Sequence, residues 1–149
     1  MAGMQQTSDP DRVVPTRRIS FDTSLDGMPT HFAQDGDLIA SHLIASLSAM
    51  FPDGEDFFVR SVRHYRSKIT DPALKQQVNG FIGQEAMHGR EHRELNDHLA
   101  SLGYPTKRIE KLIRFSLELR SKIAPPITNL AMTAALEHFT ATMAESLMT

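Results

Sequence analysis

The stretch that decides the fold reads Gln84-Glu85-Ala86-Met87-His88-Gly89-Arg90-Glu91-His92. Apolar residues recur before and after it at alternating steps of three and four, the spacing of one face of a helix. Glu85, His88 and His92 continue that alternation and take positions where core side chains would stand. A buried carboxylate costs several kcal/mol unless it is paired or bound to a cation. The spacing therefore predicts a helix whose inward face holds a metal ion.

Helix breakers divide the chain into five helical segments and leave little that reads as strand. Asp71 and Pro72 predict the start of the motif helix, because Asp is a good cap and Pro suits the first helical position. Pro52-Asp53-Gly54 should end the first helix and separate it from the second. The segments are predicted at residues 37–50, from about 55 onward, 71–103, 106–123 and from about 127 onward. The predicted fold class is all-α.

Two further glutamates occupy predicted core positions. Glu55 extends the apolar stripe of the second helix, and Glu137 lies among alanines and leucines in the fifth. Dimetal sites in helical bundles take one glutamate from each of two helices and a Glu-x-x-His pair from each of two others. Glu85 with His88 forms one such pair, and Glu55 and Glu137 are candidates for the single glutamates. His92 is a fifth candidate, as a ligand, as a partner of a ligand or as a core histidine.

The same stretch supports a second interpretation. In the pattern His88-x-x-Glu91-His92, two histidines one turn apart hold a single zinc ion, and Glu91 is the general base on its water. This site needs a third ligand, which Glu55 or Glu137 would supply. Against it, Glu91 lies off the inward stripe and beside exposed charged residues. A third interpretation is a helical interaction module without catalysis.

Composition limits the remaining choices. The 149 residues carry a net charge of -2 and no cysteine, which predicts one domain, no nucleic-acid partner and a metal site built from His and carboxylates alone. No apolar run is long enough to span a bilayer. We expect a cytoplasmic protein with a flexible leader at residues 1–30 and a helical metal-binding domain at residues 31–149.

Three motifs carry a resemblance to a known family: Phe51-Pro52-Asp53-Gly54-Glu55, the run from Phe81 to His92, and Ala135-Leu136-Glu137-His138-Phe139-Thr140. They resemble the bacterial predicted metal-dependent hydrolases, which are related to ferritin-like proteins. The resemblance implies a ferritin-like helical bundle with a carboxylate and histidine dimetal centre. Members of that family continue into a last ligand-bearing helix. Relative to the family, this chain is therefore expected to be a truncated product, or to have its site completed by a second copy in a homodimer.

The predicted donor set also indicates the metal. A hard, carboxylate-rich set with one or two imidazoles favours iron or manganese in a dinuclear site, whereas two histidines with one carboxylate suit zinc. Two irons would indicate oxygen-dependent oxidation, and one zinc would indicate hydrolysis. The apolar residues near the ligands suit a small, apolar substrate.

Overall fold

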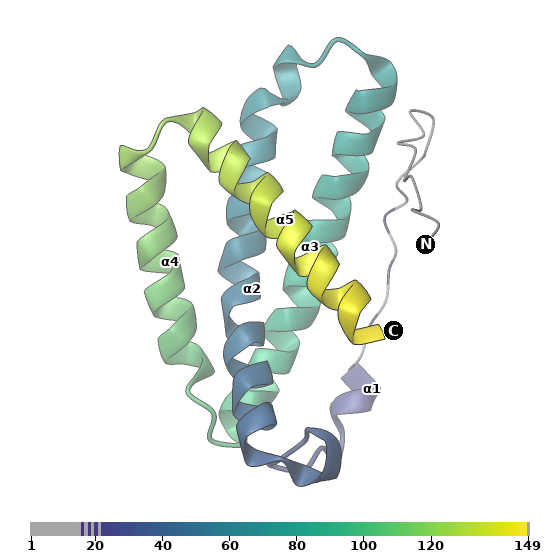
Figure 1. The fold of residues 1–149 in the computed structure, drawn as a ribbon, viewed down its shortest axis with the longest axis vertical. Helices are drawn as coiled ribbons and strands as arrows, with labels where there is room; N and C mark the ends of the chain where they lie inside the picture. Colours follow the sequence, from purple (N-terminus) through teal and green to yellow (C-terminus); the bar gives the residue numbers. More distant parts are fainter. Residues whose placement is uncertain (1–15, 17, 19, 21, 149) are drawn as a thin grey trace, which may run out of the picture.

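Five α-helices and two short 3-10 turns make up the computed structural model, which describes residues 16, 18, 20 and 22–148 (Figure 1). The described part contains no strand, so the all-α prediction is confirmed. Most of the predicted leader, residues 1–15, 17, 19 and 21, lies outside the described residues. The elements are α1 (Asp22–Leu25), η1 (Gln34–Gly36), α2 (Leu38–Tyr65), η2 (Arg66–Lys68), α3 (Pro72–Ser101), α4 (Thr106–Ile123) and α5 (Pro126–Met148).

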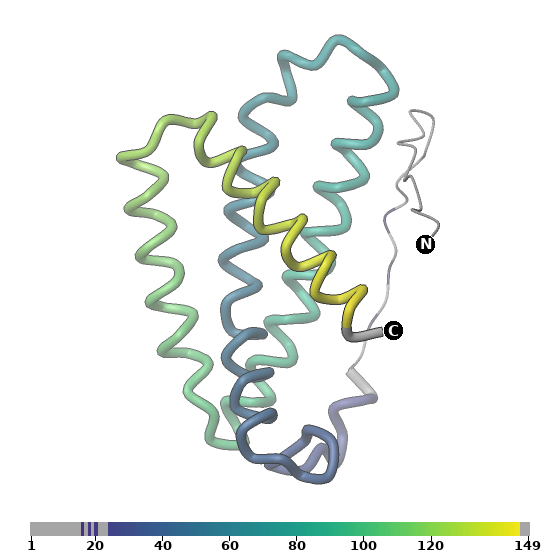
Figure 2. Tube along the Cα trace, in the orientation of Figure 1, coloured from purple at the N-terminus to yellow at the C-terminus, as the bar shows by residue number. Residues whose placement is uncertain are grey.

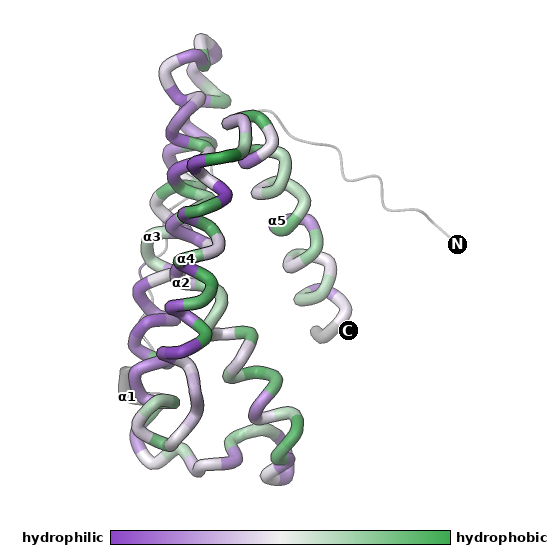
Figure 3. The backbone as a smooth tube through the Cα atoms, turned by 90° about the vertical axis from the view of Figure 1, so that its left-hand side faces the viewer, coloured by the Kyte–Doolittle hydropathy of each residue, from purple (hydrophilic) through white to green (hydrophobic). Residues whose placement is uncertain are grey.

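The helices form a bundle around α2. The most extensive packing joins α2 to α3, and α4 then packs mainly on α2 and less on α3. Helix α5 packs chiefly on α2 and crosses the bundle obliquely, as the tube in Figure 2 shows. In the side view of Figure 3, α5 is a mostly apolar helix that diverges from the bundle toward its C-terminal end. One face of α5 therefore looks onto α2, and much of the rest is exposed.

The predicted break between the first two helices is wrong, because α2 runs without interruption from Leu38 to Tyr65 with Pro52 inside it. Proline has no N–H, so it cannot donate to the Ser48 carbonyl one turn earlier. The side chain of Asn96, on α3, takes over that role and donates from Nδ2 to the Ser48 oxygen at 3.2 Å. A partner from the neighbouring helix thus allows α2 to continue through its proline.

The predicted ends of α3 and α4 are confirmed within a residue or two. Asp71 caps α3 by accepting a hydrogen bond from the backbone N–H of Ala73 at 2.9 Å, and Gly103 follows its end with a φ of 98°, a conformation that glycine adopts without strain. The apolar core nearest this end contains Ala45, Leu99 and Tyr104. No helix in the described part of the chain combines the length and hydropathy needed to cross a membrane.

Large apolar side chains remain exposed on several helices, and most of them lie on α2 and α4. The exposed ones of α2 lie in its N-terminal half, and those of α4 recur at steps of three and four along one face. A single copy of the described chain therefore leaves apolar surface uncovered on both helices. These side chains are Leu38, Ile39, Leu43, Ile44, Leu47 and Met50 on α2, and Leu112, Phe115, Leu119 and Ile123 on α4.

Candidate metal centre

A cavity of about 330 Å³ lies between α2, α3 and α5 and brings together all five of the predicted ligands. Glu55 reaches it from α2, and Glu137 reaches it from α5. Glu85, His88 and His92 reach it from successive turns of α3, because steps of three and four keep them on one face of a helix. Glu55 and Glu137 thus share one cavity although they are 82 positions apart in the sequence.

The tightest group in this cavity is Glu55 with His88 and His92. One ligand atom from each of these side chains lies within 4.8 Å of the others, and His88 Nδ1 is 3.1 Å from Glu55 Oε1. Atoms bound to one ion at about 2 Å lie within roughly 4 Å of one another. Small side-chain adjustments would therefore let the three hold one metal ion, with Glu85 and Glu137 beside it on the cavity wall.

Glu55 fits a metal ligand better than a structural carboxylate. Its side chain is 2% exposed, its Oε1 lies 3.1 Å from His88 Nδ1, and its Oε2 has no hydrogen-bond partner in the described part of the chain. Burial raises the pKa of Glu55, although the hydrogen-bonding and charge of His88 act in the opposite direction. Buried polar atoms are nearly always satisfied in native proteins, so the unpaired Oε2 beside the cavity suits a cation.

The carboxylates of the cavity also repel one another. Burial, followed by the negative charges of Glu137 and Glu55, raises the pKa of Glu85 to about 7. Burial and the charge of Glu55 raise the pKa of Glu137 as well. The three groups thus hold their negative charges at a cost, and a divalent cation between them would remove that cost.

His92 is held as a neutral imidazole. Burial, followed by the charge of His88, lowers the pKa of His92 to about 4. Its Nδ1 is 2.9 Å from Ser48 Oγ, and its ring stacks on Phe51 with centroids 4.5 Å apart and an interplanar angle of 13°. The neutral imidazole is the form that binds metals.

The sequence predicts that the inward face of α3 is buried, and this is correct for Glu85 but wrong for His88. The Glu85 residue is 8% exposed, but the His88 side chain is 63% exposed. Since both line the same cavity, His88 marks the side on which the cavity opens to solvent.

Gly89 explains how α3 comes so close to Glu55. A Cβ atom on Gly89 would lie 2.9 Å from Glu55 Oε2, closer than carbon and oxygen atoms pack. The absent side chain therefore leaves the room that the Glu55 carboxylate occupies.

Gly89→Ala should weaken metal binding about tenfold or more while the helices persist. The new methyl group meets the flexible end of Glu55, so we expect the carboxylate to move away from the two histidines and the backbone to stay. Isothermal titration calorimetry with the metal ion measures the affinity, and circular dichroism measures the helix content. Gly54→Ala is the matched control, because nothing lies within 4 Å of its new methyl group. Equal metal affinity in both variants would contradict the role of Gly89.

Comparison with known proteins agrees with this donor set. A family model described as predicted metal-dependent hydrolase matches residues 15–149, nearly the whole chain. The chain belongs to this family. No curated protein and no solved structure matches it.

Within this member of the predicted metal-dependent hydrolases, Glu91 lies apart from the other candidates. Its Oε1 accepts a hydrogen bond from Arg90 Nη2 at 2.6 Å, and it is not among the residues that line the cavity. Its role as a general base therefore stays a prediction from the sequence pattern. Glu85, in contrast, is a carboxylate with a raised pKa that does line the cavity beside the two histidines.

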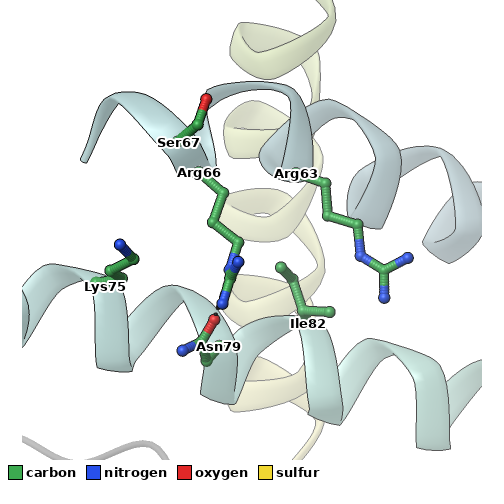
Figure 4. Close-up of a pocket in the computed structure, with 6 residues that line it drawn as sticks. All are labelled: Arg63, Arg66, Ser67, Lys75, Asn79 and Ile82. Carbon is green, nitrogen blue, oxygen red and sulfur yellow. Dashed lines mark hydrogen bonds between the residues drawn. The ribbon is translucent and has the colours of Figure 1, made fainter.

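A second and larger cavity, of about 720 Å³, has the opposite character (Figure 4). Its lining contains three cationic side chains and no carboxylate, so it does not suit a metal ion. Arg66 Nε, on η2, donates to Asn79 Oδ1, on α3, at 2.8 Å, and Figure 4 shows these two side chains pointing toward each other. The lining residues are Arg63, Arg66, Ser67, Lys75, Asn79 and Ile82.

Sequence reasoning missed two polar residues behind the site, Ser48 and Asn96. Ser48 is 4% exposed and Asn96 is fully buried. Asn96 follows His92 by four residues and so continues the inward stripe of α3, a signal that could have singled it out. Ser48 had no such signal, because a serine among the small residues of α2 is common in any packed helix.

Proposed function

We propose that the five cavity side chains form a dinuclear metal centre, with iron or manganese as the metal, and that the protein catalyses the oxygen-dependent oxidation of a small, apolar substrate. The observation that carries this proposal is the meeting of three carboxylates and two imidazoles in one cavity. Such a carboxylate-rich set is the donor pattern of dimetal sites in helical bundles.

Charge balance favours two ions over one. Glu55, Glu85 and Glu137 together carry three negative charges when ionised, and the pKa values of all three are raised by burial before any mutual repulsion is counted. One divalent ion held by Glu55, His88 and His92 would leave Glu85 and Glu137 beside it without a partner. A second ion held by these two glutamates accounts for every acidic group that lines the cavity.

The rest of the lining supports an apolar substrate. Phe51, Phe58 and Met143 lie around the carboxylates, together with Ala141 and Ala144 of α5. These side chains offer no hydrogen bonds to a polar ligand. Thr140 also lines the cavity, and its hydroxyl donates to backbone carbonyls of α5. Two iron or manganese ions bound here would supply oxygen activation. In the metal-free protein the pKa of Glu85 is about 7, so binding of the ions near neutral pH would release a proton from this group.

A second candidate function is hydrolysis at a single zinc ion. The observation in its favour is the compact group of Glu55, His88 and His92, since two histidines and one glutamate are a known ligand set of catalytic zinc. The family description points the same way. In this version Glu85 would accept the proton from water in place of Glu91, because Glu85 lines the cavity.

Metal stoichiometry separates the two candidates. We expect the metal-free protein to take up two ferrous or manganous ions per cavity in an anaerobic titration, and we expect Glu137→Gln to reduce this to one. Oxygen consumption by the iron-loaded protein, measured with an oxygen electrode, should fall at least about tenfold in the same variant. The readouts are metal per chain, from elemental analysis, and the rate of oxygen uptake.

Glu145→Gln is the control, because it makes the same change to an exposed glutamate of the same helix. One zinc ion per chain, retained in Glu137→Gln and accompanied by ester or amide hydrolysis, would replace oxidation with the second candidate. No stoichiometric metal in the wild-type protein would refute both.

The predicted homodimer remains part of this proposal. The exposed apolar side chains of α2 and α4 support it, because such surface is usually covered in an assembly. A second copy would also bring further carboxylates near a centre that has one glutamate fewer than the full pattern of four glutamates and two histidines. The mass of the protein in solution, measured by light scattering, tests it.

A further inference from the structure

We propose that Ser48 and Asn96 are positioning residues that fix the His92 ring as its Nδ1–H tautomer, so that Nε2 carries the free lone pair. This inference rests on the proposed function in one respect, namely that the lone pair serves a metal ion. The hydrogen-bond argument for the tautomer concerns the metal-free protein and stands separately.

The orientation of Asn96 follows from its partners. Its Nδ2 donates to the Ser48 carbonyl oxygen at 3.2 Å and to Glu110 Oε1 at 3.1 Å. A backbone carbonyl can only accept, so the amide nitrogen must be the atom that faces it. The other amide atom, Oδ1, therefore faces Ser48 Oγ, at 2.8 Å.

The single proton of the Ser48 hydroxyl is thereby committed. Asn96 Oδ1 can only accept, so the hydroxyl donates to it. The second contact of the Ser48 hydroxyl is His92 Nδ1 at 2.9 Å. With its proton already donated, the hydroxyl oxygen can only accept in that contact. His92 must then carry its proton on Nδ1.

The consequence concerns the other ring nitrogen. A neutral imidazole has one N–H, so a proton on Nδ1 leaves Nε2 as a lone pair. Ligand histidines commonly donate their second N–H to a protein acceptor, which sets both the tautomer and the ring direction. Phe51, stacked on the same ring, limits its rotation further. His92 is thus prepared as a ligand before any metal arrives.

Pro52 is the reason that this arrangement exists on α2. A residue with an N–H at position 52 would bond to the Ser48 carbonyl within the helix and compete with Asn96 for the acceptor that fixes its amide. Glu110, which is 8% exposed, extends the chain of hydrogen bonds to α4 through Asn96. A proline, a serine and an asparagine on two helices therefore act on one histidine.

The decisive measurement is the tautomer of His92 in the metal-free protein near neutral pH. Two-bond proton–nitrogen correlation spectra of protein with labelled histidine distinguish the two tautomers, and His92→Gln identifies the His92 signals among the seven histidines. We expect wild-type His92 to be protonated on Nδ1. A ring protonated on Nε2 would overturn the proposal.

Two variants test the residues that impose the tautomer. Ser48→Ala removes the acceptor, so we expect the Nε2–H form to become the major one and metal affinity to fall about ten- to a hundredfold. Asn96→Leu frees the Ser48 proton to point at His92 Nδ1, and we expect the Nε2–H form to increase there too. If the tautomer of His92 is unchanged in Ser48→Ala, Ser48 is not a positioning residue. If it is unchanged in Asn96→Leu, Asn96 is not one.

Ser41→Ala is the matched control. It removes another buried hydroxyl from α2, one that bonds to the backbone of Asp37 and Ala33 and does not contact His92. It should change neither the tautomer nor the metal affinity, whereas a loss of affinity equal to that of Ser48→Ala would assign the effect to helix packing and overturn the proposal. If wild-type His92 is protonated on Nδ1 but the protein binds no metal, the proposed metal centre fails and the positioning of His92 stands.

Discussion

Glu55→Gln should abolish stoichiometric metal binding and leave the metal-free protein at least as stable as the wild type. The carboxylate is buried, and burial raises its pKa in spite of His88 Nδ1 at 3.1 Å from Oε1, so its charge costs stability until a cation binds. Glutamine has the same size without that charge. We expect metal affinity to fall more than about a hundredfold, measured by calorimetric titration, and the thermal midpoint of the metal-free protein to rise or stay unchanged.

The combination of these two results is what identifies a ligand. A structural carboxylate would behave in the opposite way, because losing it would lower the thermal midpoint and leave metal content unaffected. Glu118→Gln on α4 makes the same substitution at an exposed glutamate and should change neither quantity. Wild-type metal affinity in Glu55→Gln would remove Glu55 from the proposed centre.

Glu85→Gln should stabilise the metal-free protein by an amount that grows as the pH rises. The folded-state pKa of Glu85 is about 7, above the ordinary value of 4.5. Below pH 4.5 the group is protonated in both the folded and the unfolded state, so the substitution has little effect. Between pH 4.5 and about 7, Glu85 is ionised in the unfolded state but still protonated in the folded state, so the wild type loses stability as the pH rises. Above about pH 7 the stability gained in Glu85→Gln reaches a plateau of up to about 3 kcal/mol.

Urea unfolding across this pH range measures that difference. His92 contributes the opposite slope, because its lowered pKa gives stability above 6.5 that is lost as the pH falls toward 4. This contribution is shared by both proteins and largely cancels in the difference. Saturating metal should reverse the sign, since the folded wild type would bind two ions and the variant only the one held by Glu55, His88 and His92. If Glu85→Gln raises the free energy of unfolding by the same amount at every pH, the raised pKa of Glu85 is contradicted.

The sequence was most informative where local rules and packing agree. Asp71 and Pro72 predicted the start of α3, and the three-and-four spacing predicted that Glu85, His88 and His92 share a face. It failed at Pro52, because the propensity of proline to end helices was outweighed by a hydrogen bond from Asn96, a residue 44 positions further along the chain. Such long-range partners leave no trace in a local pattern.

The same limit applies to the candidate centre. Glu55 and Glu137 were predicted as core carboxylates on separate helices, but only the fold shows that they share a cavity with α3. The exposure of His88 could not be predicted, because it depends on the oblique path of α5 and not on the period of α3. The bond between Ser48 and His92 depends likewise on the register between two helices.

The oblique packing of α5 has a consequence for how fast metal would enter and leave the proposed centre. A hydrogen bond of 2.7 Å between Ser61 and Thr133 fastens its N-terminal half to α2, while Glu137 and the apolar wall of the cavity lie further along the helix. An opening of α5 about Thr133 would carry Glu137 away from α3 and leave the histidines in place. The rate of metal exchange in this protein would then be the opening rate of one helix, and a cross-link between α5 and α3 would trap the metal without strengthening a single ligand bond.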